Sequence, residues 1–246
     1  MQLRTLLYGE GIFETILWRG RTKKLYRHYE RLRSSAQFFQ IPCPDFESFC
    51  NFIEEKTENR KNLYVKFCLL SKGESLFYAT PEQSEVLIIV KEYNPVKKPR
   101  RLCISNIKRH SSDPVIYHKT INYLQNILIK RQALKNGFDD AIILNERDEI
   151  TECSSSNILL FKDDTFFTPY RECGLLLGTT LKTLMDKFEI KEAKIKIEDL
   201  FRYSAIFILN SLVGVLPVCK IMDKEFSYDE NLINYLNSLI DEENSI

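Results

Sequence analysis

The chain has 246 residues, of which 44% are apolar and 28% are charged. This composition is typical of a globular protein with a sizeable core and excludes a disordered chain. The 35 basic and 34 acidic residues give a formal net charge of +1. Such a balance predicts neither a nucleic-acid partner nor binding to a charged membrane surface.

The cysteines and the apolar runs indicate the compartment. The seven cysteines are scattered without a CxxC pair, so we expect neither a metal site nor a disulfide framework. No apolar run reaches the ~20 residues that span a bilayer. The first residues lack the pattern of a secretory signal. We therefore expect a cytoplasmic protein with reduced thiols and no membrane partner.

The first predicted domain covers residues 1–94. Its expected elements, in chain order, are a strand over 12–18, a turn at Gly20, helices over 26–40 and 46–58, and strands over 63–70 and 86–90. Residues 95–99 are predicted to be a linker, because Pro95 and Pro99 interrupt any regular element.

The second predicted domain covers residues 100–246. We expect a strand over 102–107, a helix over 120–136, strands over 141–144, 157–161 and 165–168, a helix over 180–188, a strand over 205–209 and a last helix capped by Asp229. Helices and strands do not alternate regularly. The order therefore argues against a doubly wound parallel sheet and predicts an α+β protein of two domains.

Four places along the chain carry residue types that suit chemistry. Lys119 precedes an amphipathic helix, and a lysine becomes a nucleophile where burial or a neighbouring cation favours its neutral form. Glu152 is followed by three serines and Asn157, and such small groups let a backbone approach a ligand. Gly178-Thr-Thr180 opens a helix whose N–H groups suit an anion, and Arg31 points away from the core face of its own helix. Each feature alone also fits a structural role: a solvated lysine, a polar turn, an ordinary helix cap and an exposed arginine.

Taken in order, these segments resemble the class IV aminotransferase family, the fold-type IV enzymes of pyridoxal phosphate. The matching segments are Tyr8-Gly-Glu-Gly-Ile-Phe-Glu-Thr15, His28-x-x-Arg-Leu32, Lys119-Thr-Ile-Asn-Tyr-Leu124, Thr151-Glu-Cys-Ser-Ser-Ser-Asn157, Gly178-Thr-Thr180 and Asn210-Ser-Leu-Val-Gly-Val-Leu-Pro-Val218. The resemblance covers nearly the whole chain, although the family usually has a further strand before the first segment. It implies a small α/β N-terminal domain and a larger, β-rich pseudo-barrel domain that binds pyridoxal 5'-phosphate.

The resemblance also implies a role for each matched residue. Lys119 would form a Schiff base with the cofactor and move protons at the substrate α-carbon. Glu152 would pair with the pyridine nitrogen of the ring. The ligands of the cofactor phosphate would be Arg31, Thr179, Thr180 and Ser211. These residue types suit the group, because a phosphate dianion favours an arginine fork and N–H donors, and a ring cation favours a carboxylate.

Within the family, the lyase branch is the most similar. Lys119-x-x-Asn122 resembles the spacing shared by lyases and D-amino acid aminotransferases, which differs from that of branched-chain enzymes. The segment from Asn210 to Val218 resembles 4-amino-4-deoxychorismate lyase, which makes 4-aminobenzoate and pyruvate for folate biosynthesis. The loop over 71–78 lacks the Arg-x-His pair of D-amino acid aminotransferases. Lys72 or Arg109 would then hold the substrate carboxylate, although a lysine cannot form a bidentate fork.

Two alternatives stay open at this point. The first is a class IV aminotransferase that acts on branched-chain or D-amino acids. The second is a non-catalytic binding protein, which would leave the ordered set of motifs unexplained. The family resemblance further implies a homodimer with a small-molecule substrate.

Overall fold

A computed structural model describes residues 2–243 of the chain. These residues divide into two compact units. The first unit comprises residues 2–95, 118–122 and Glu243, and the second comprises residues 96–117 and 123–242. The division after Pro95 falls at the linker predicted over residues 95–99. The short segment 118–122 belongs to the first unit, although the residues before and after it belong to the second.

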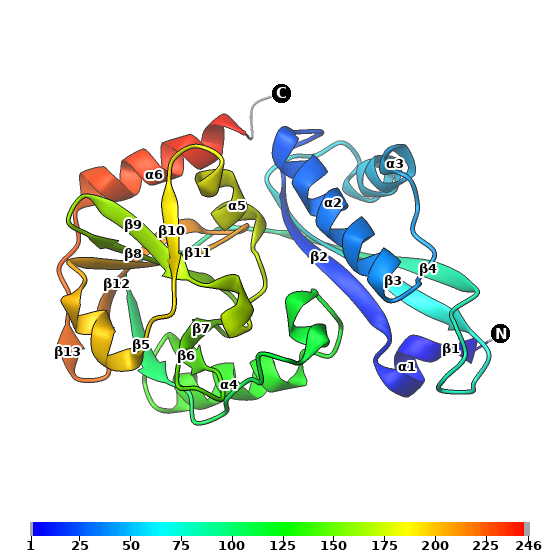
Figure 1. Ribbon diagram of the computed structural model, residues 1–246. Helices are drawn as coiled ribbons and strands as arrows, with labels where there is room; N and C mark the ends of the chain where they lie inside the picture. Colours follow the sequence, from blue (N-terminus) through cyan, green and yellow to red (C-terminus); the bar gives the residue numbers. More distant parts are fainter. Residues whose placement is uncertain (1, 244–246) are drawn as a thin grey trace. The chain divides into compact units, whose positions relative to one another are not determined.

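The first unit is a four-stranded sheet with two long helices on one face (Figure 1). Its elements are β1 (Gln2–Leu3), α1 (Arg4–Tyr8), β2 (Gly11–Trp18), α2 (Lys23–Phe38), α3 (Phe46–Thr57), β3 (Leu63–Gly73) and β4 (Gln83–Glu92). Strand β3 lies between β2 and β4 and is antiparallel to both. Alternate residues of β2 and β3, among them Ile16, Val65 and Phe67, form one buried cluster with Leu32 of α2 and Phe49 of α3.

Both long helices of this unit begin at a capping side chain. The Thr22 side chain accepts a hydrogen bond from the Leu25 N–H, and the Asp45 side chain accepts one from the Ser48 N–H. The caps confirm the two predicted helices. They also explain why α2 starts at Lys23, before the predicted first residue.

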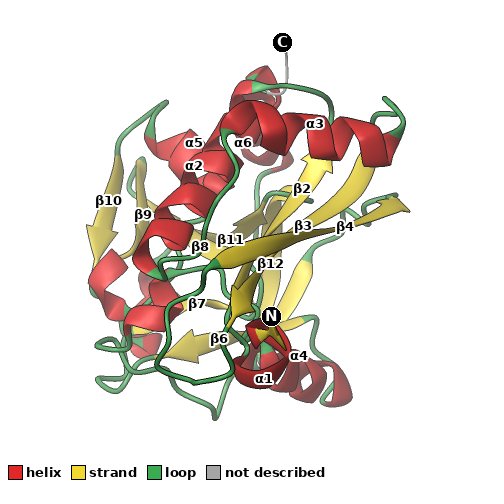
Figure 2. Ribbon diagram, turned by 90° about the vertical axis from the view of Figure 1, so that its right-hand side faces the viewer, coloured by secondary structure: helices red, strands yellow, loops and turns green. Residues whose placement is uncertain are grey.

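The second unit is a nine-stranded sheet with helices packed on it (Figures 1 and 2). Its elements are β5 (Arg100–Ile104), η1 (Pro114–Tyr117), α4 (Leu124–Lys135), β6 (Asp140–Leu144), β7 (Ile150–Cys153), β8 (Asn157–Lys162), β9 (Thr165–Pro169), η2 (Arg171–Cys173), α5 (Thr179–Met185), β10 (Ile190–Ala193), η3 (Ile197–Arg202), β11 (Ala205–Asn210), β12 (Gly214–Ile221), β13 (Lys224–Glu225) and α6 (Glu230–Glu242).

The connection between β7 and β8 shows why this sheet is curled. The strand order is β10-β9-β8-β11-β12-β5-β6-β7, with β13 beside β12, so β7 and β8 are far apart in the hydrogen-bonded order. Only residues 154–156 connect them along the chain. The sheet must therefore bend until the two strands approach, which gives the predicted pseudo-barrel. One apolar cluster lies among its strands, and a second lies against α5 and α6.

Two local predictions were wrong. The helix predicted over 120–136 begins only at Leu124, because the backbone around Thr120 is bonded to β2 instead. The segment Ile150–Cys153 was treated as part of a turn region, but it is strand β7. Its four residues are all buried, so the alternation that identifies a half-buried strand is absent.

Candidate active site

Lys119 lies beside Thr120, which forms an isolated antiparallel bridge with Ile12 of β2, at the edge of the first unit's sheet. The Phe13 N–H donates to the Lys119 carbonyl at 2.9 Å, and the Ile121 N–H donates to the Gly11 carbonyl at 2.9 Å. These two bonds fix the backbone on both sides of Thr120. The Lys119 Nζ then lies 4.5 Å from the centroid of the Phe13 ring.

A second ammonium group lies beside the same ring. The Lys66 Nζ is 4.1 Å from the Phe13 centroid, so Phe13 contacts the amines of Lys66 and Lys119. Sequence reasoning did not single out Lys66. The signal was present, because Val65 and Phe67 belong to the buried cluster beneath α2 and α3, and the residue between them must face the other way.

Arg31, on α2, is bound by the carboxylate of Glu14 on β2. Its Nε donates to Oε1 at 2.7 Å and its Nη2 donates to Oε2 at 2.6 Å. Glu14 is buried and also bonds to Nδ1 of His28 at 2.7 Å. Burial alone would raise the pKa of Glu14, but the charge of Arg31 and the hydrogen bonds from Arg31 and His28 outweigh it and lower this pKa to about 2. Arg31 is thus an oriented, largely buried cation and not the exposed arginine of the structural alternative.

His28 completes this buried cluster as a neutral group. Burial is the main cause that lowers the pKa of His28, and the hydrogen bond that its ring donates to the Glu14 carboxylate opposes this shift. With its pKa below the ordinary value, the ring is uncharged at neutral pH. Arg31 is therefore the charged partner of the Glu14 carboxylate.

Glu152, on β7, is buried with Arg109 against it. The Arg109 Nη1 donates to Oε1 of Glu152, and the Asn157 Nδ2 donates to Oε2 at 3.3 Å. The Arg109 N–H donates to the Leu144 carbonyl at 2.9 Å, which fixes the arginine beside the end of β6. Donors of this kind favour the ionised form of a carboxylate. Arg109 was predicted as a substrate ligand. Its guanidinium bonds to Glu152, and the role of substrate ligand stays a prediction.

Tyr123 is a further, partly buried group near Glu152. Burial, followed by the charge of Glu152, raises the pKa of Tyr123 to about 12. Its hydroxyl donates to the Ser154 carbonyl at 3.3 Å. Tyr123 is therefore a neutral donor at physiological pH. Sequence reasoning gave Tyr123 no role and placed it inside the helix predicted over 120–136, whereas it is the residue before the first residue of α4.

The start of α5 is tied to Glu152 through Asn157. The Asn157 Oδ1 accepts a hydrogen bond from the Gly178 N–H at 3.0 Å, and its Nδ2 donates to the Leu176 carbonyl at 2.8 Å. A Cβ at position 178 would lie 2.2 Å from that Oδ1, so only glycine fits. Thr179 and Thr180 follow as the first residues of α5 and are buried.

The Thr180 hydroxyl tests whether this end of the site fits a phosphate. Its Oγ1 is buried and has no hydrogen-bond partner among the residues that the structure describes. A buried hydroxyl without a partner costs free energy, and such groups are rare in folded proteins. An oxygen-rich ligand at the start of α5 would satisfy it, so this residue fits the predicted phosphate role.

Ser211 lies in the turn between β11 and β12. Asn210 shapes this turn, because its Oδ1 accepts from the Leu212 N–H at 3.0 Å and from the Val213 N–H at 3.1 Å. The Asn210 Nδ2 donates to the Ser156 Oγ at 3.0 Å, which joins the turn to the segment after Glu152. Lys72, the other predicted substrate ligand, lies in β3 and pairs with Glu85 at 3.0 Å.

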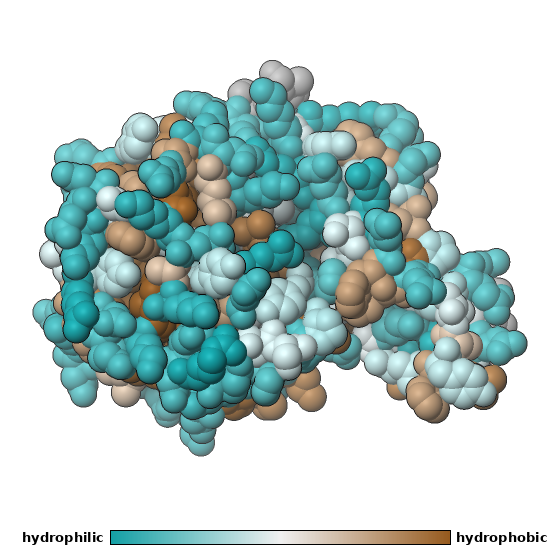
Figure 3. Space-filling view, in the orientation of Figure 1, coloured by the Kyte–Doolittle hydropathy of each residue, from teal (hydrophilic) through white to brown (hydrophobic). Residues whose placement is uncertain are grey.

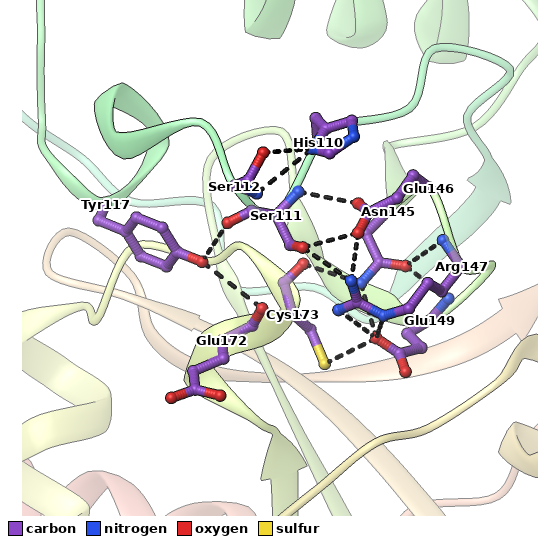
Figure 4. Close-up of polar contacts among 10 residues, drawn as sticks. All are labelled: His110, Ser111, Ser112, Tyr117, Asn145, Glu146, Arg147, Glu149, Glu172 and Cys173. Atoms are coloured by element: carbon purple, nitrogen blue, oxygen red, sulfur yellow. Dashed lines mark hydrogen bonds and ion pairs between the residues drawn. The ribbon is translucent and has the colours of Figure 1, made fainter.

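A polar network holds the loop between Arg109 and Tyr117 (Figure 4). The Ser111 N–H and hydroxyl donate to the Glu146 carboxylate at 2.8 and 2.7 Å, and these bonds are the main cause that lowers the pKa of Glu146 to about 2. The Tyr117 hydroxyl donates to the Ser111 carbonyl at 2.6 Å, and the Arg147 Nη1 donates to the Ser111 hydroxyl at 2.9 Å. The network keeps the chain that leads from Arg109 towards Lys119 in one conformation.

The predicted site residues thus form two sets. Lys119 and Arg31 belong to the first unit. The remaining cofactor residues belong to the second unit: Glu152, Thr179, Thr180 and Ser211. Within residues 2–243, no group of three or more His, Cys, Asp or Glu side chains suits a metal ion. In the same part of the chain, no helix has both the length and the apolar character that crossing a membrane requires.

Known proteins share this sequence pattern and fold. Residues 11–221 match the amino-transferase class IV family. A Rickettsia felis protein with the provisional name branched-chain-amino-acid aminotransferase is 26% identical, over 93% of this chain and 84% of its own. An aminodeoxychorismate lyase of Vibrio harveyi is 23% identical, over 92% of this chain and 88% of its own. The crystal structure of a Legionella pneumophila protein, provisionally a 4-amino-4-deoxychorismate lyase, has a TM-score of 0.90 and 28% identity over 97% of this chain and 93% of that chain.

These findings and the curled sheet define a pyridoxal-phosphate-dependent enzyme of fold type IV. The chain belongs to the class IV aminotransferase family. The predicted resemblance, fold and cofactor are therefore confirmed, together with a small-molecule substrate. The relatives include both aminotransferases and lyases, so the family alone does not select the reaction.

Proposed function

We propose that the protein is a 4-amino-4-deoxychorismate lyase that supplies 4-aminobenzoate for folate biosynthesis in the cytoplasm. The turn after β11 carries this proposal. Because the Asn210 Oδ1 already accepts from the N–H groups of Leu212 and Val213, these donors are not available to a substrate carboxylate. Aminotransferases of the family tend to have small residues with Thr or Ser in this segment. This chain has the lyase form, Asn-Ser-Leu followed by Pro217-Val218. Here the Asn210 side chain closes the turn.

Residues of each set would contribute to the binding of pyridoxal phosphate. When bound, the cofactor supplies an aldehyde for a Schiff base and a ring that accepts electrons. Lys119 provides the amine for that bond, and Glu152 holds the proton on the pyridine nitrogen. Arg31, aimed by Glu14, and the Thr180 hydroxyl would bind the phosphate.

Lys119 would also carry the proton that the reaction moves. A neutral amine takes the proton from the substrate ring carbon that bears the amino group. The carbon–oxygen bond to the enolpyruvyl group then breaks, and this group takes up a proton and becomes pyruvate. The ring becomes aromatic, which makes the step favourable without any amino acceptor.

The decisive experiment supplies 4-amino-4-deoxychorismate to the holoenzyme and measures 4-aminobenzoate and pyruvate. A panel of branched-chain and D-amino acids with keto acids runs in parallel. We expect equal amounts of the two products from the first substrate and no amino transfer in the panel. Amino transfer alone would overturn the lyase proposal and favour the branched-chain activity that the Rickettsia felis relative is named for.

The assignment of Lys119 has its own test. Borohydride reduction of the holoenzyme, followed by peptide mapping, should place the cofactor on Lys119. Lys119→Ala should lose the visible absorbance and the product, whereas Lys61→Ala, at an exposed position, should keep both. Label on any other lysine would contradict the assignment.

We further propose that the protein is a homodimer. Helix α4 presents an exposed apolar stripe, which soluble monomers rarely leave uncovered. The exposed fractions are 66% for Leu124, 37% for Ile127, 47% for Leu128 and 56% for Leu134. Figure 3 shows apolar surface along the edge where α4 lies. Sedimentation should give a dimer for the native chain and a monomer for Leu128→Glu. A native monomer would contradict the proposal.

A further inference from the structure

His118, the residue before Lys119, contacts three side chains. Two belong to α2, Ser35 and Phe38, and the third is Phe39 at the C-terminal cap of α2. The His118 ring stacks on Phe38, with the centroids 4.3 Å apart and the planes 26° apart. The edge of the same ring meets Phe39 at 5.0 Å and 70°. Its Nδ1 lies 3.0 Å from the Ser35 Oγ, within hydrogen-bonding distance. An aromatic ring with one polar edge satisfies all three contacts at once.

The backbone of this segment is fixed on its other side. Strand β2 bonds to the carbonyl of Lys119 and to the N–H of Ile121. Thr120 pairs antiparallel with Ile12, and neighbouring side chains next to such a pair point to opposite faces. A His118 ring that is held against α2 therefore directs the Lys119 side chain towards Phe13, where its amine is found.

We propose that His118 is a positioning residue that sets the direction of the Lys119 amine. The stack on Phe38 and the contact with Ser35 prevent the segment from rotating about its own axis. Because α2 also carries Arg31, one helix then sets the position of both cofactor-binding side chains of the first unit. The proposal rests on the proposed function in one respect, which is that Lys119 binds the cofactor.

The contacts of His118 predict which substitutions the site tolerates. His118→Phe keeps the stack and loses the bond to Ser35, whereas His118→Asn keeps a polar group and loses the stack. His118→Ala loses both. The stack buries more surface than the single hydrogen bond, so phenylalanine should restore the positioning and asparagine should not.

The test compares these three holoenzymes with the native enzyme and with His110→Ala, a control at an exposed histidine. We expect kcat of His118→Ala to fall by roughly tenfold to a hundredfold with KM nearly unchanged, as for a small misplacement of a reacting group. The visible circular dichroism of the bound cofactor should weaken in parallel, because it reports the orientation of the ring. His118→Phe should restore both readouts, whereas His118→Asn should remain at the values of His118→Ala. The control His110→Ala should keep the native values.

Three results would overturn the inference. They are a native kcat and dichroism in His118→Ala, a loss expressed only in KM, and rescue by Asn without rescue by Phe. If His118→Ala does not fold, the Phe and Asn variants together with Ser35→Ala still separate the two contacts. Borohydride mapping of the native enzyme distinguishes the two failures: cofactor on another lysine contradicts the proposed function, whereas cofactor on Lys119 with an unaffected His118→Ala contradicts this inference alone.

Discussion

The buried carboxylate of Glu14 accepts hydrogen bonds from two nitrogens of Arg31, at 2.7 and 2.6 Å. Glu14 lies on strand β2, and Arg31 lies on helix α2, which packs on that strand. The two bonds therefore fix the arginine before any ligand binds. A preoriented cation loses less conformational entropy when it binds a phosphate. Glu14 is therefore expected to act on the cofactor through Arg31.

The first prediction concerns cofactor affinity. Glu14→Gln should raise the Kd for pyridoxal phosphate at least tenfold, because it leaves Arg31 without its charged partner. Affinity for pyridoxal, which has no phosphate, should not change. Titration of the apoenzyme with both compounds provides the measurement. An equal loss for both compounds would show that Glu14 supports the fold and not the phosphate site.

The second prediction concerns acid stability. The pKa of Glu14 is about 2 in the folded chain, below the ordinary value of 4.5. Its stabilising contribution is therefore present above about pH 4.5 and is lost as the pH falls towards 2. The difference in unfolding free energy between the chain with Glu14 and the chain with Glu14→Gln should shrink on acidification through this range. Urea unfolding at several pH values measures it, and a constant difference would contradict the pairing. Both proteins carry His28→Gln in this comparison, because the Glu14 carboxylate also affects the pKa of His28 and its titration would otherwise differ between them.

The third prediction separates two roles for Arg109. If its guanidinium serves Glu152, Arg109→Met should lower kcat and shift the visible spectrum of the bound cofactor. It should also destabilise the fold by about 3–5 kcal/mol, as removal of one partner of a buried ion pair does. Arg101→Met, at an exposed arginine, is the control. A rise in KM alone would instead support the substrate role predicted from the sequence.

The fourth prediction concerns the Thr180 hydroxyl. Thr180→Val removes a buried donor that has no protein partner, so the apoenzyme should be no less stable. Its affinity for pyridoxal phosphate should nevertheless fall. Thr168→Val is the matched control, because the Thr168 hydroxyl donates to the Ile158 carbonyl at 2.8 Å. That variant should lose stability and keep its affinity, and the reverse pattern would exclude Thr180 from the phosphate site.

The fifth prediction compares two lysines of β3. Lys66 shares the Phe13 ring with Lys119, whereas Lys72 is paired with Glu85. We expect Lys66→Met to raise KM for a carboxylate-bearing substrate at least tenfold and Lys72→Met to leave it nearly unchanged. Steady-state kinetics with each variant decides between them. The opposite result would restore Lys72 as the substrate ligand.

The candidate cofactor residues could be singled out from the sequence because they lie in short, ordered segments. Glu152 with Asn157 and Gly178 with Thr180 are separated by few residues, and their spacing is visible in one chain. Helices α2 and α3 were also predictable, since periodic apolar residues and capping side chains are local signals.

The partners of those residues could not be found in this way. Glu14 lies 17 positions from Arg31, and Arg109 lies 43 positions from Glu152. Each pair forms only because two elements come together in the fold. The same reason explains the error at residues 120–123, where bonding to β2 overrides a helical pattern. Long-range pairing leaves no periodic trace in the sequence.

The double bonding of Asn157 has an evolutionary consequence. One amide group contacts both the acid on β7 and the first turn of α5, so their separation is determined by a single side chain. Insertions or deletions between β8 and α5 would leave this separation unchanged. Homologues can therefore vary in loop length here, but a slip of one residue in β8 would displace both contacts together.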